Sequence, residues 1–320
     1  MLGTLLADAI PRHIPTIPAL RRNGKGRKDW DRINDLLAKN AIPVTVRFTE
    51  KKGHATEYTR EAIGKGFRKF ISVGGDGTLN EIVNGAFTQE HCTPSELLLG
   101  MIPVGTGNDW GRMFSIPLVY EGAVKVIMEG RQMPHDIGVI DYFNGENRER
   151  RYFINIAGLG FESLVVIKTN RQKEKGKSSK AIYFFNLLAS LLSWRHRNAD
   201  IIIDGIKNSC KIFSINIGNG RYCGGGMRQT PDALPDDGLL DITVIREMSR
   251  FEVIKSLKLL YDGTILSHPK VDGYRSTNLS VQSDSLLYIE SDGESLGHTP
   301  AEFRILPGAI NIVYGSRIIR

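Results

Sequence analysis

The fold of this chain is decided by residues 71–81, Ile-Ser-Val-Gly-Gly-Asp-Gly-Thr-Leu-Asn-Glu. A short apolar strand pattern runs into the first glycine, and a helical pattern over residues 79–87 follows the last one. Glycines at such a junction let the backbone approach a ligand, and the N–H groups of a helix start can bind phosphate. Thr78 and Glu81 have the spacing of a capping box, but capping does not explain an aspartate between glycines. We therefore interpret this segment as a ligand site at the carboxyl end of a sheet strand.

A second loop of small residues follows the next strand pattern. Residues 97–101 are apolar, and residues 102–109 are Ile-Pro-Val-Gly-Thr-Gly-Asn-Asp. Neither loop contains the Gly-Lys-Ser/Thr of a Walker A loop or the spacing Gly-x-Gly-x-x-Gly. Because neighbouring parallel strands end at the same edge of a sheet, the two loops together predict a nucleotide site.

Helical and strand patterns alternate around both loops, from about residue 27 to residue 140. We expect helices at residues 27–40, 56–65, 79–87 and 120–129, and strands at residues 42–48, 69–73 and 97–103. This alternation predicts a parallel sheet covered by helices on both faces, in a three-layer α/β domain spanning residues 1–140. The first ~25 residues are atypical for such a domain, because prolines interrupt the expected first strand.

The pattern changes after about residue 145. Strand patterns occupy residues 151–157, 199–203, 211–217, 239–245, 285–290 and 310–314, and only two helices interrupt them, at residues 181–194 and 251–260. We expect the polar segment 168–180 to be a mobile loop. The pattern predicts a mostly antiparallel β-sandwich over residues 141–320, whose C-terminal tail could return to the first domain.

Composition limits the class of protein. Lys and Arg exceed Asp and Glu by 42 − 35 = 7, which favours anionic partners without choosing among them. The three cysteines, Cys92, Cys210 and Cys223, lie far apart, so we expect neither a disulfide framework nor a thiolate zinc site. No apolar stretch reaches the ~20 residues of a membrane span, and prolines break any signal peptide. These features predict a soluble, cytoplasmic protein.

Five motifs together resemble the diacylglycerol kinase catalytic-domain family, and most closely its soluble bacterial diacylglycerol and lipid kinases. They are residues 74–81, residues 103–109, residues 217–226 (Ile-Gly-Asn-Gly-Arg-Tyr-Cys-Gly-Gly-Gly), residues 231–241 (Pro-Asp-Ala-Leu-Pro-Asp-Asp-Gly-Leu-Leu-Asp) and residues 292–294 (Asp-Gly-Glu). The Gly-Gly-Asp-Gly motif alone is not specific, because NAD kinases share it. Several motifs in the right order are specific.

The resemblance implies an ATP- and Mg²⁺-dependent lipid kinase with an NAD-kinase-like nucleotide-binding domain. It implies that Asp76 and Asp109 hold or tune the catalytic Mg²⁺, that Asp136 is a supporting acid, and that Glu294 is the general base. It implies ATP contacts at Thr49, Gly74, Gly75, Asp76, Gly77, Thr78, Leu79, Asn80, Glu81, Gly105, Thr106 and Asn108. It implies a second, structural Mg²⁺ at the carbonyls of Leu234 and Leu239 and the carboxylate of Asp237.

General chemistry agrees with these implied roles. Phosphoryl transfer needs positioned phosphates, neutralised charge and one base near the attacking hydroxyl. Hard Mg²⁺ prefers carboxylate, carbonyl and water oxygens. The local sequence by itself favours an ordinary turn acid at Glu294, and Asp237 is equally compatible with a hairpin residue.

Two other functions stay open at this stage. One is an NAD kinase, because the Gly-Gly-Asp-Gly turn and the two-domain layout are shared. The other is a nucleotide-binding regulatory protein that has lost catalysis, since residues 16–26 lack the family's Asn-Pro start of the glycine-rich loop.

The expected partners are a lipid alcohol and a membrane surface. Basic residues between Lys168 and Lys180 precede the apolar helix at 181–194, which suits peripheral docking on an anionic bilayer as well as an ordinary solvated loop. We expect no nucleic acid, because no DNA- or RNA-binding motif accompanies the charge. A homodimer is compatible with the sequence.

Overall fold

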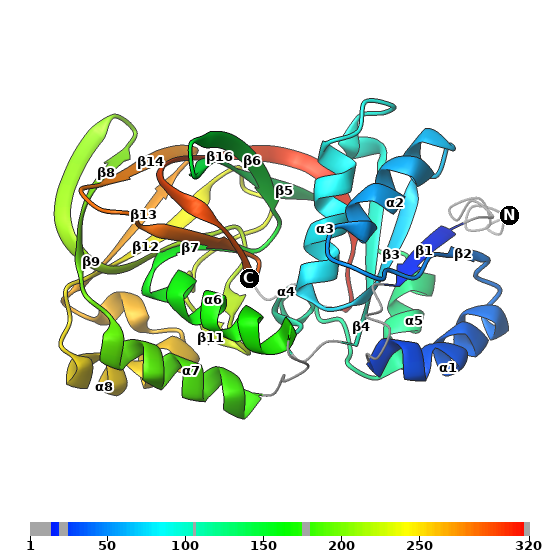
Figure 1. Cartoon of the computed structure of the whole chain (residues 1–320). Helices are drawn as coiled ribbons and strands as arrows, with labels where there is room; N and C mark the ends of the chain where they lie inside the picture. Colours follow the sequence, from blue (N-terminus) through cyan, green and yellow to red (C-terminus); the bar gives the residue numbers. More distant parts are fainter. Residues whose placement is uncertain (1–13, 19–24, 105–106, 175–179, 317–320) are drawn as a thin grey trace, which may run out of the picture. The chain divides into compact units, whose positions relative to one another are not determined.

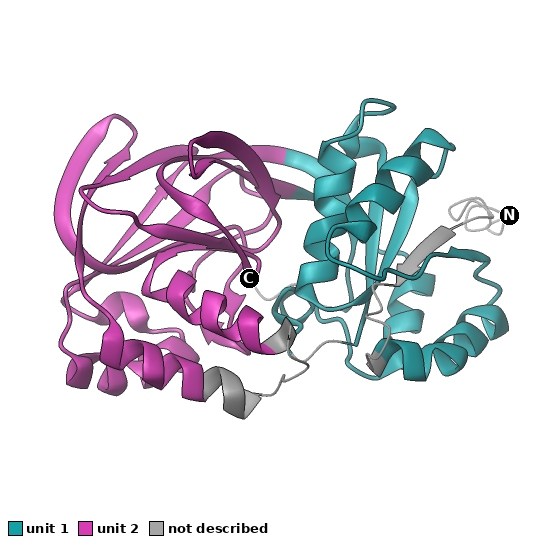
Figure 2. Ribbon diagram, viewed as in Figure 1, with its two compact units in different colours: residues 1–135, 308–319 teal, residues 136–307, 320 magenta. Residues whose placement is uncertain are grey.

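Two strands, β5 (Gln132–Asn144) and β16 (Glu294–Val313), belong in part to each of the two units into which contacts divide the chain (Figure 2). Unit 1 contains residues 1–135 and 308–319, and unit 2 contains residues 136–307 and residue 320. The structure is a computed structural model, which describes residues 14–18, 25–104, 107–174 and 180–316. Each unit has its own sheet and its own helices, so each is described by itself.

A parallel sheet forms the middle layer of unit 1. Its strands lie in the order β16–β4–β3–β1–β2, with β1 at Ile14–Pro18, β2 at Val44–Val46, β3 at Lys69–Gly74 and β4 at Leu98–Pro103. Five of the six residues of β3 and of β4 are buried, as expected for strands covered on both faces. The predicted parallel sheet is confirmed.

Helices cover this sheet on both sides. Helices α2 (His54–Gly64) and α3 (Asp76–Phe87) pack together on one face, and α1 (Lys25–Lys39) and α5 (Tyr120–Glu129) lie on the other (Figure 1). Two short helices, η1 (Pro94–Glu96) and α4 (Asp109–Met113), lie beside β4 in the sequence. α2 and α3 approach closely at Gly85, where a β-carbon would lie only 2.7 Å from the carbonyl oxygen of Thr56.

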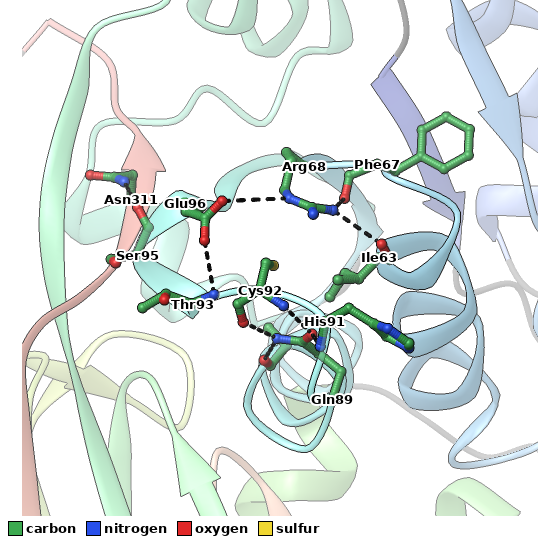
Figure 3. A network of polar contacts seen from close by, with 11 residues as sticks. Ile63, Phe67, Arg68, Gln89, His91, Cys92, Thr93, Ser95, Glu96 and Asn311 are labelled. Atoms are coloured by element: carbon green, nitrogen blue, oxygen red, sulfur yellow. Dashed lines mark hydrogen bonds and ion pairs between the residues drawn. The ribbon is translucent and has the colours of Figure 1, made fainter.

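A polar network occupies the amino ends of β3 and β4 (Figure 3). Arg68, just before β3, donates to the carbonyls of Ile63 and Phe67, each at 3.0 Å, and lies 3.9 Å from the Glu96 carboxylate. Asn311 of β16 donates to the Ser95 carbonyl at 2.6 Å. These contacts join neighbouring elements to one another, so polar side chains at this end have a structural task, whereas the motif residues follow the carboxyl ends.

Two details of unit 1 differ from the sequence-based expectation. α3 begins at Asp76 rather than at residue 79, and its N-cap, Gly75, provides no side-chain hydrogen bond. The predicted capping box of Thr78 and Glu81 is therefore wrong, because the helix starts one turn earlier. β1 pairs in parallel with both β2 and β3, so the proline-containing N-terminal region does supply a strand.

Antiparallel strands build unit 2. They are β6 (Asn147–Phe153), β7 (Ile156–Gly160), β8 (Arg197–Ile203), β9 (Ile206–Gly218), β12 (Leu240–Arg246), β13 (Val271–Ser276), β14 (Asn278–Ser283) and β15 (Tyr288–Ser291), with the inner parts of β5 and β16; β10 (Tyr222–Cys223) and β11 (Met227–Arg228) form a separate small hairpin. Six strands pair in a closed ring, β7–β15–β16–β14–β8–β9. Closing the ring leaves none of these six strands as an open edge and encloses an apolar core. The predicted antiparallel, β-rich second domain is confirmed.

Within the described residues three α-helices accompany this sheet, where the sequence predicted two. They are α6 (Phe161–Glu174), α7 (Lys180–Ser193) and α8 (Arg250–Asp262), with a short helix η2 (Ile265–Ser267), and they bury a second apolar cluster against the sheet. The mobile loop predicted at 168–180 is contradicted for residues 168–174 and for residue 180, which are helical. Residues 175–179 lie outside the described chain. The second half of α6 is almost entirely polar, so it has no apolar periodicity that would reveal a helix.

The strand predicted at 151–157 is in fact the end of β6 and the start of β7, and β5, β13 and β14 were not anticipated. Within the described residues, no helix is long and apolar enough to span a bilayer.

Candidate active-site residues

The carboxylate of Asp76 joins the two glycine-containing loops of unit 1. Its Oδ2 accepts the backbone N–H of Asp109 at 3.1 Å, and its Oδ1 accepts that of Trp110 at 3.2 Å. Asp76 is the first residue of α3 after β3, and Asp109 is the first residue of α4 after β4. The two loops therefore meet at the carboxyl ends of neighbouring parallel strands, as the motif pattern led us to expect.

Asp76 and Asp109 flank the same glycine. A β-carbon at Gly107 would lie 3.2 Å from Oδ2 of Asp76 and 3.6 Å from Oδ2 of Asp109. Two carboxylates converging on one point, with Asp109 only 5% exposed, suit a hard divalent cation that also keeps water ligands. Among the described residues no group of three His, Cys, Asp or Glu side chains is arranged to hold a metal ion. Protein Mg²⁺ sites commonly use one or two carboxylates together with substrate phosphates.

Other predicted ATP contacts surround this point. Gly74 ends β3, and a β-carbon there would lie 2.5 Å from the Thr78 hydroxyl, so this glycine permits the tight turn into α3. Thr49 and Asn80 are buried, and Asn108 precedes α4 with a left-handed φ of 52°. Gly75 is the N-cap of α3, and Gly77 and Leu79 lie in its first turn. Gly105 and Thr106 lie outside the described residues.

Glu81 has a structural contact that the sequence did not reveal. Its Oε1 accepts the N–H of Gly53 at 2.8 Å, and its Oε2 accepts the N–H of Ala55 at 3.0 Å. These donors belong to the start of α2, which has no side-chain cap of its own. Glu81 on α3 therefore caps a different helix, because the close packing of α2 and α3 brings the carboxylate to it.

In unit 2, Asp136 organises the loop that precedes β12. Its backbone N–H donates to the Pro235 carbonyl at 2.7 Å, and its Oδ2 accepts the N–H of Gly238 at 2.6 Å. Asp136 is 1% exposed. The carboxylate thus holds the segment that contains Leu234, Asp237 and Leu239.

The Asp237 carboxylate already has a cationic partner. Its Oδ1 accepts the N–H of Leu239 at 3.0 Å, and its Oδ2 pairs with the guanidinium of Arg275. The same guanidinium lies 3.4 Å from Oδ2 of Asp241, whose pKa burial raises to about 6 although Arg275 opposes the shift. This arrangement does not fit a second Mg²⁺ at Asp237 as long as Arg275 is in place.

Glu294 follows a tight hairpin between β15 and β16. Ser291 and Glu294 pair across a two-residue turn in which Asp292 (φ 48°) and Gly293 (φ 80°) are both left-handed. The Asp292 carboxylate accepts three backbone N–H groups, from Ile154, Asn155 and Ile156, at 3.0–3.1 Å. Asp292 therefore anchors the turn, and the part-exposed Glu294 is held at a defined place on the end of β16.

Two side chains near this turn were missed by the sequence analysis. Asn170 of α6 donates to the Gly293 carbonyl at 3.0 Å, and it lies in the segment expected to be a loop. Glu290 of β15 is fully buried, and its Oε2 accepts the N–H of Gly293 at 3.0 Å. Burial and, next, the carboxylate of Glu162 raise the pKa of Glu290 well above its usual range, so folding favours the protonated carboxyl. No local pattern distinguishes such a residue from an exposed strand glutamate.

A small cavity lies between α6, α8 and the sheet of unit 2. Its walls are mostly apolar, and the buried side-chain oxygens of Asn216 and Gln229 on it have no hydrogen-bond partner among the described residues. The cavity is about 40 Å³, which suits a few water molecules.

Two family models match the chain, one in each half. Residues 22–140 match the diacylglycerol kinase catalytic domain, and residues 155–314 match the YegS C-terminal NAD kinase beta sandwich-like domain. The chain therefore belongs to the diacylglycerol kinase catalytic-domain family, which confirms the resemblance seen in its motifs. Membership in this family supports a kinase function.

Individual relatives cover most of the chain. It is 31% identical to a diacylglycerol kinase from Staphylococcus carnosus, over 86% of each protein. It is 30% identical to a Serratia proteamaculans protein named "Probable lipid kinase YegS-like", over 93% of this chain and 94% of that one.

Solved structures confirm the fold class. A diacylglycerol kinase from Bacillus anthracis superposes with a TM-score of 0.70 at 22% identity, covering 96% of this chain and 98% of the other. Yeast NADH kinase superposes with a TM-score of 0.53 at 12% identity, covering 95% and 84%. The fold is thus shared with NAD-kinase-type proteins, and fold alone does not separate the two activities.

Proposed function

We propose that the protein is an ATP- and Mg²⁺-dependent lipid kinase that transfers the γ-phosphate of ATP to a hydroxyl of diacylglycerol or a similar lipid. The observation that carries this proposal is the Asp76 carboxylate, which ties the Gly-Gly-Asp-Gly turn to the second loop beside Asp109. Family membership supports the kinase chemistry, and the names of the relatives support the lipid acceptor.

Unit 1 would bind the nucleotide. The start of α3 offers backbone N–H groups to phosphate, and the glycines at 74, 75 and 77 leave room for it. Asp76 and Asp109 would hold Mg²⁺, which when bound neutralises charge on the phosphates during transfer. The proposed ATP contacts are Thr49, residues 74–80, Gly105, Thr106 and Asn108; Glu81 would act through α2 rather than by touching ATP.

Unit 2 would supply the acceptor chemistry. Glu294 would take the proton of the lipid hydroxyl as that oxygen attacks the γ-phosphorus, while ADP leaves. Asp136 supports this unit by positioning the loop before β12. A second Mg²⁺ at Leu234, Asp237 and Leu239 stays a prediction that requires Arg275 to leave Asp237. We also propose a cytoplasmic enzyme that associates with the membrane during turnover.

The test is a transfer assay with purified protein, γ-labelled ATP and a panel of acceptors. Diacylglycerol, sphingoid bases and a polyprenol represent the lipid classes, and NAD represents the alternative suggested by the shared fold. Label in a lipid supports the proposal, and label in NADP alone would replace it with NAD kinase.

Calorimetry beside the assay separates the remaining alternative. A protein that binds MgATP but transfers phosphate to none of the acceptors is a nucleotide-binding regulator. Asp76→Asn and Glu294→Gln, measured in parallel, show whether any observed transfer depends on the proposed residues.

A further inference from the structure

Helix α8 carries two different stripes of side chains. One stripe, at residues 253, 256, 257 and 260, is turned into the second apolar cluster of unit 2. The other stripe contains Phe251, Ile254, Lys255 and Lys258, all exposed, with Phe251 66% and Ile254 50% exposed. A helix that packs by one face needs a polar outer face in water, so large apolar side chains on that outer face require an explanation.

Helix α7 presents a similar outer face beside it. Leu187 and Leu191 enter the same apolar cluster as the inner stripe of α8, while Phe185 and Leu192 are 67% and 69% exposed. Arg250, the first residue of α8, donates to the Leu192 carbonyl at 2.7 Å, which places the start of α8 beside the end of α7. Helices α7 and α8 lie on the same side of the unit 2 sheet (Figure 1). Because both bury their inner stripes in the same apolar cluster, their outer stripes face away from that cluster.

We propose that this α7–α8 face docks the enzyme on an anionic lipid bilayer. The face is defined by six residues: Phe185, Leu192, Phe251, Ile254, Lys255 and Lys258. The inference rests on the proposed function, because a kinase whose acceptor lies in a bilayer has to reach that surface.

The charge of the α7–α8 face favours an anionic bilayer over a second copy of the chain as its binding partner. The ammonium of Lys255 lies 4.4 Å from the centre of the Phe251 ring, so cations and apolar side chains are interleaved on one stripe. Of the two acids of α8, Glu252 pairs with Lys270 at 2.7 Å and Asp262 is the last residue. In an interfacial helix, apolar side chains insert into the bilayer, and neighbouring cations contact anionic headgroups. The outer stripe of α8 has both kinds of side chain. A symmetric second copy would instead place lysines against lysines.

The experiment measures co-sedimentation of the full chain with vesicles of phosphatidylcholine alone and with vesicles that also contain phosphatidylglycerol. We expect preferential binding to the anionic vesicles, weakened by salt. Lys255→Gln with Lys258→Gln should weaken this binding about thirty-fold, at the usual contribution of a surface cation. Phe251→Ser with Ile254→Ser should weaken it at least about ten-fold.

The controls are the same kinds of substitution, Ile to Ser and Lys to Gln, at exposed positions outside the α7–α8 face. Ile206→Ser alters a residue that is 69% exposed at the start of β9, and Lys125→Gln alters an exposed lysine of α5. Both should bind vesicles like the parent. The proposal would be overturned if the controls lost as much vesicle binding as the lysine and apolar variants of the α7–α8 face. It would also be overturned if those variants bound vesicles like the parent. A parent dimer that Phe251→Ser with Ile254→Ser converts to monomer, with vesicle binding intact, would identify a second copy as the occupant and also overturn it.

Activity distinguishes this inference from the proposed function. On a short-chain diacylglycerol dissolved as monomer, the α7–α8 variants should transfer phosphate like the parent; on long-chain diacylglycerol in anionic vesicles they should be slower by the factor lost in binding. If the parent phosphorylates no lipid, the proposed function fails, whereas vesicle binding still reports on the docking face.

Discussion

At the scale of single residues, substitutions of Asp76 and of Glu294 should affect kcat and MgATP binding differently. Glu294→Gln keeps size and hydrogen bonding but cannot accept a proton, so kcat should fall roughly 10²–10⁴-fold while MgATP affinity stays near that of the parent. Asp76→Asn loses the charge beside Asp109 and one of two acceptors for the start of α4, so MgATP binding should weaken as well. Kinetics and calorimetry check both, and near-normal kcat in Glu294→Gln would mean that the base lies elsewhere.

Arg275 and a structural Mg²⁺ should compete for Asp237. In Arg275→Gln the Asp237 carboxylate loses its cation, so Mg²⁺ should raise the melting temperature of this variant more than that of the parent. The double variant with Asp237→Asn should show no such gain. If Mg²⁺ stabilises parent and Arg275→Gln equally, no Mg²⁺ binds at Asp237.

Glu290 should make the free energy of unfolding decrease as pH rises, which is the opposite of the usual effect of a glutamate. Its pKa is raised in the folded protein, so the unfolded chain releases a proton that the folded chain keeps. The free energy of unfolding should therefore be highest below about pH 4.5 for this group and fall by up to about 1.4 kcal/mol per pH unit above it. Glu290→Gln should remove this slope.

Urea unfolding of the parent and Glu290→Gln at about pH 5 and about pH 7 checks this expectation. The advantage of the variant should grow with pH. Glu146→Gln serves as the control, since this glutamate is exposed in the turn between β5 and β6. A constant difference between parent and Glu290→Gln would show that the buried carboxyl is ionised in both states.

At the scale of elements, α2 depends on a carboxylate from α3. Glu81→Ala leaves the N–H groups of Gly53 and Ala55 without their acceptor, so the free energy of unfolding should fall by about 1–3 kcal/mol. Glu81→Gln keeps one acceptor and should lose less. Hydrogen exchange should locate the loss in α2, and a variant that changes only the KM for ATP would restore Glu81 as a direct ATP contact.

At the scale of the whole molecule, the C-terminal strand supports unit 1. Asn311 and Ile312 of β16 pair in parallel with β4, and Ile310, Ile312 and Val313 are buried. Truncation after Pro307 removes the part of β16 that belongs to unit 1 and exposes the edge of β4, so unit 1 should become sensitive to proteolysis and lose MgATP binding. Hydrogen exchange in the β7–β15–β16–β14–β8–β9 ring should change little.

Ile312→Ala should destabilise the same part of unit 1 less than the truncation does. It should cost about 2–5 kcal/mol through the cavity it leaves, without removing the strand. Equal destabilisation of both units by the truncation would show that they unfold as one.

The sequence by itself determined the alternation of strands and helices in the first half and the two glycine loops after β3 and β4. These features are local, because apolar periodicity and glycines between a strand and a helix are patterns of consecutive residues. The same locality explains why the sequence indicated a turn at Glu294, and it explains why α6, with its polar second half, was not recognised.

Only the tertiary structure decided which side chains serve which element. The carboxylate of Glu81 reaches α2, that of Asp292 reaches the chain before β7, and that of Asp237 meets Arg275, each across 26 or more residues of sequence. The burial that raises the pKa of Glu290 and the closure of the six-strand ring are equally nonlocal. A hydrogen bond or a burial between distant segments leaves no pattern in either segment, because its energy depends on the packing that brings the two together.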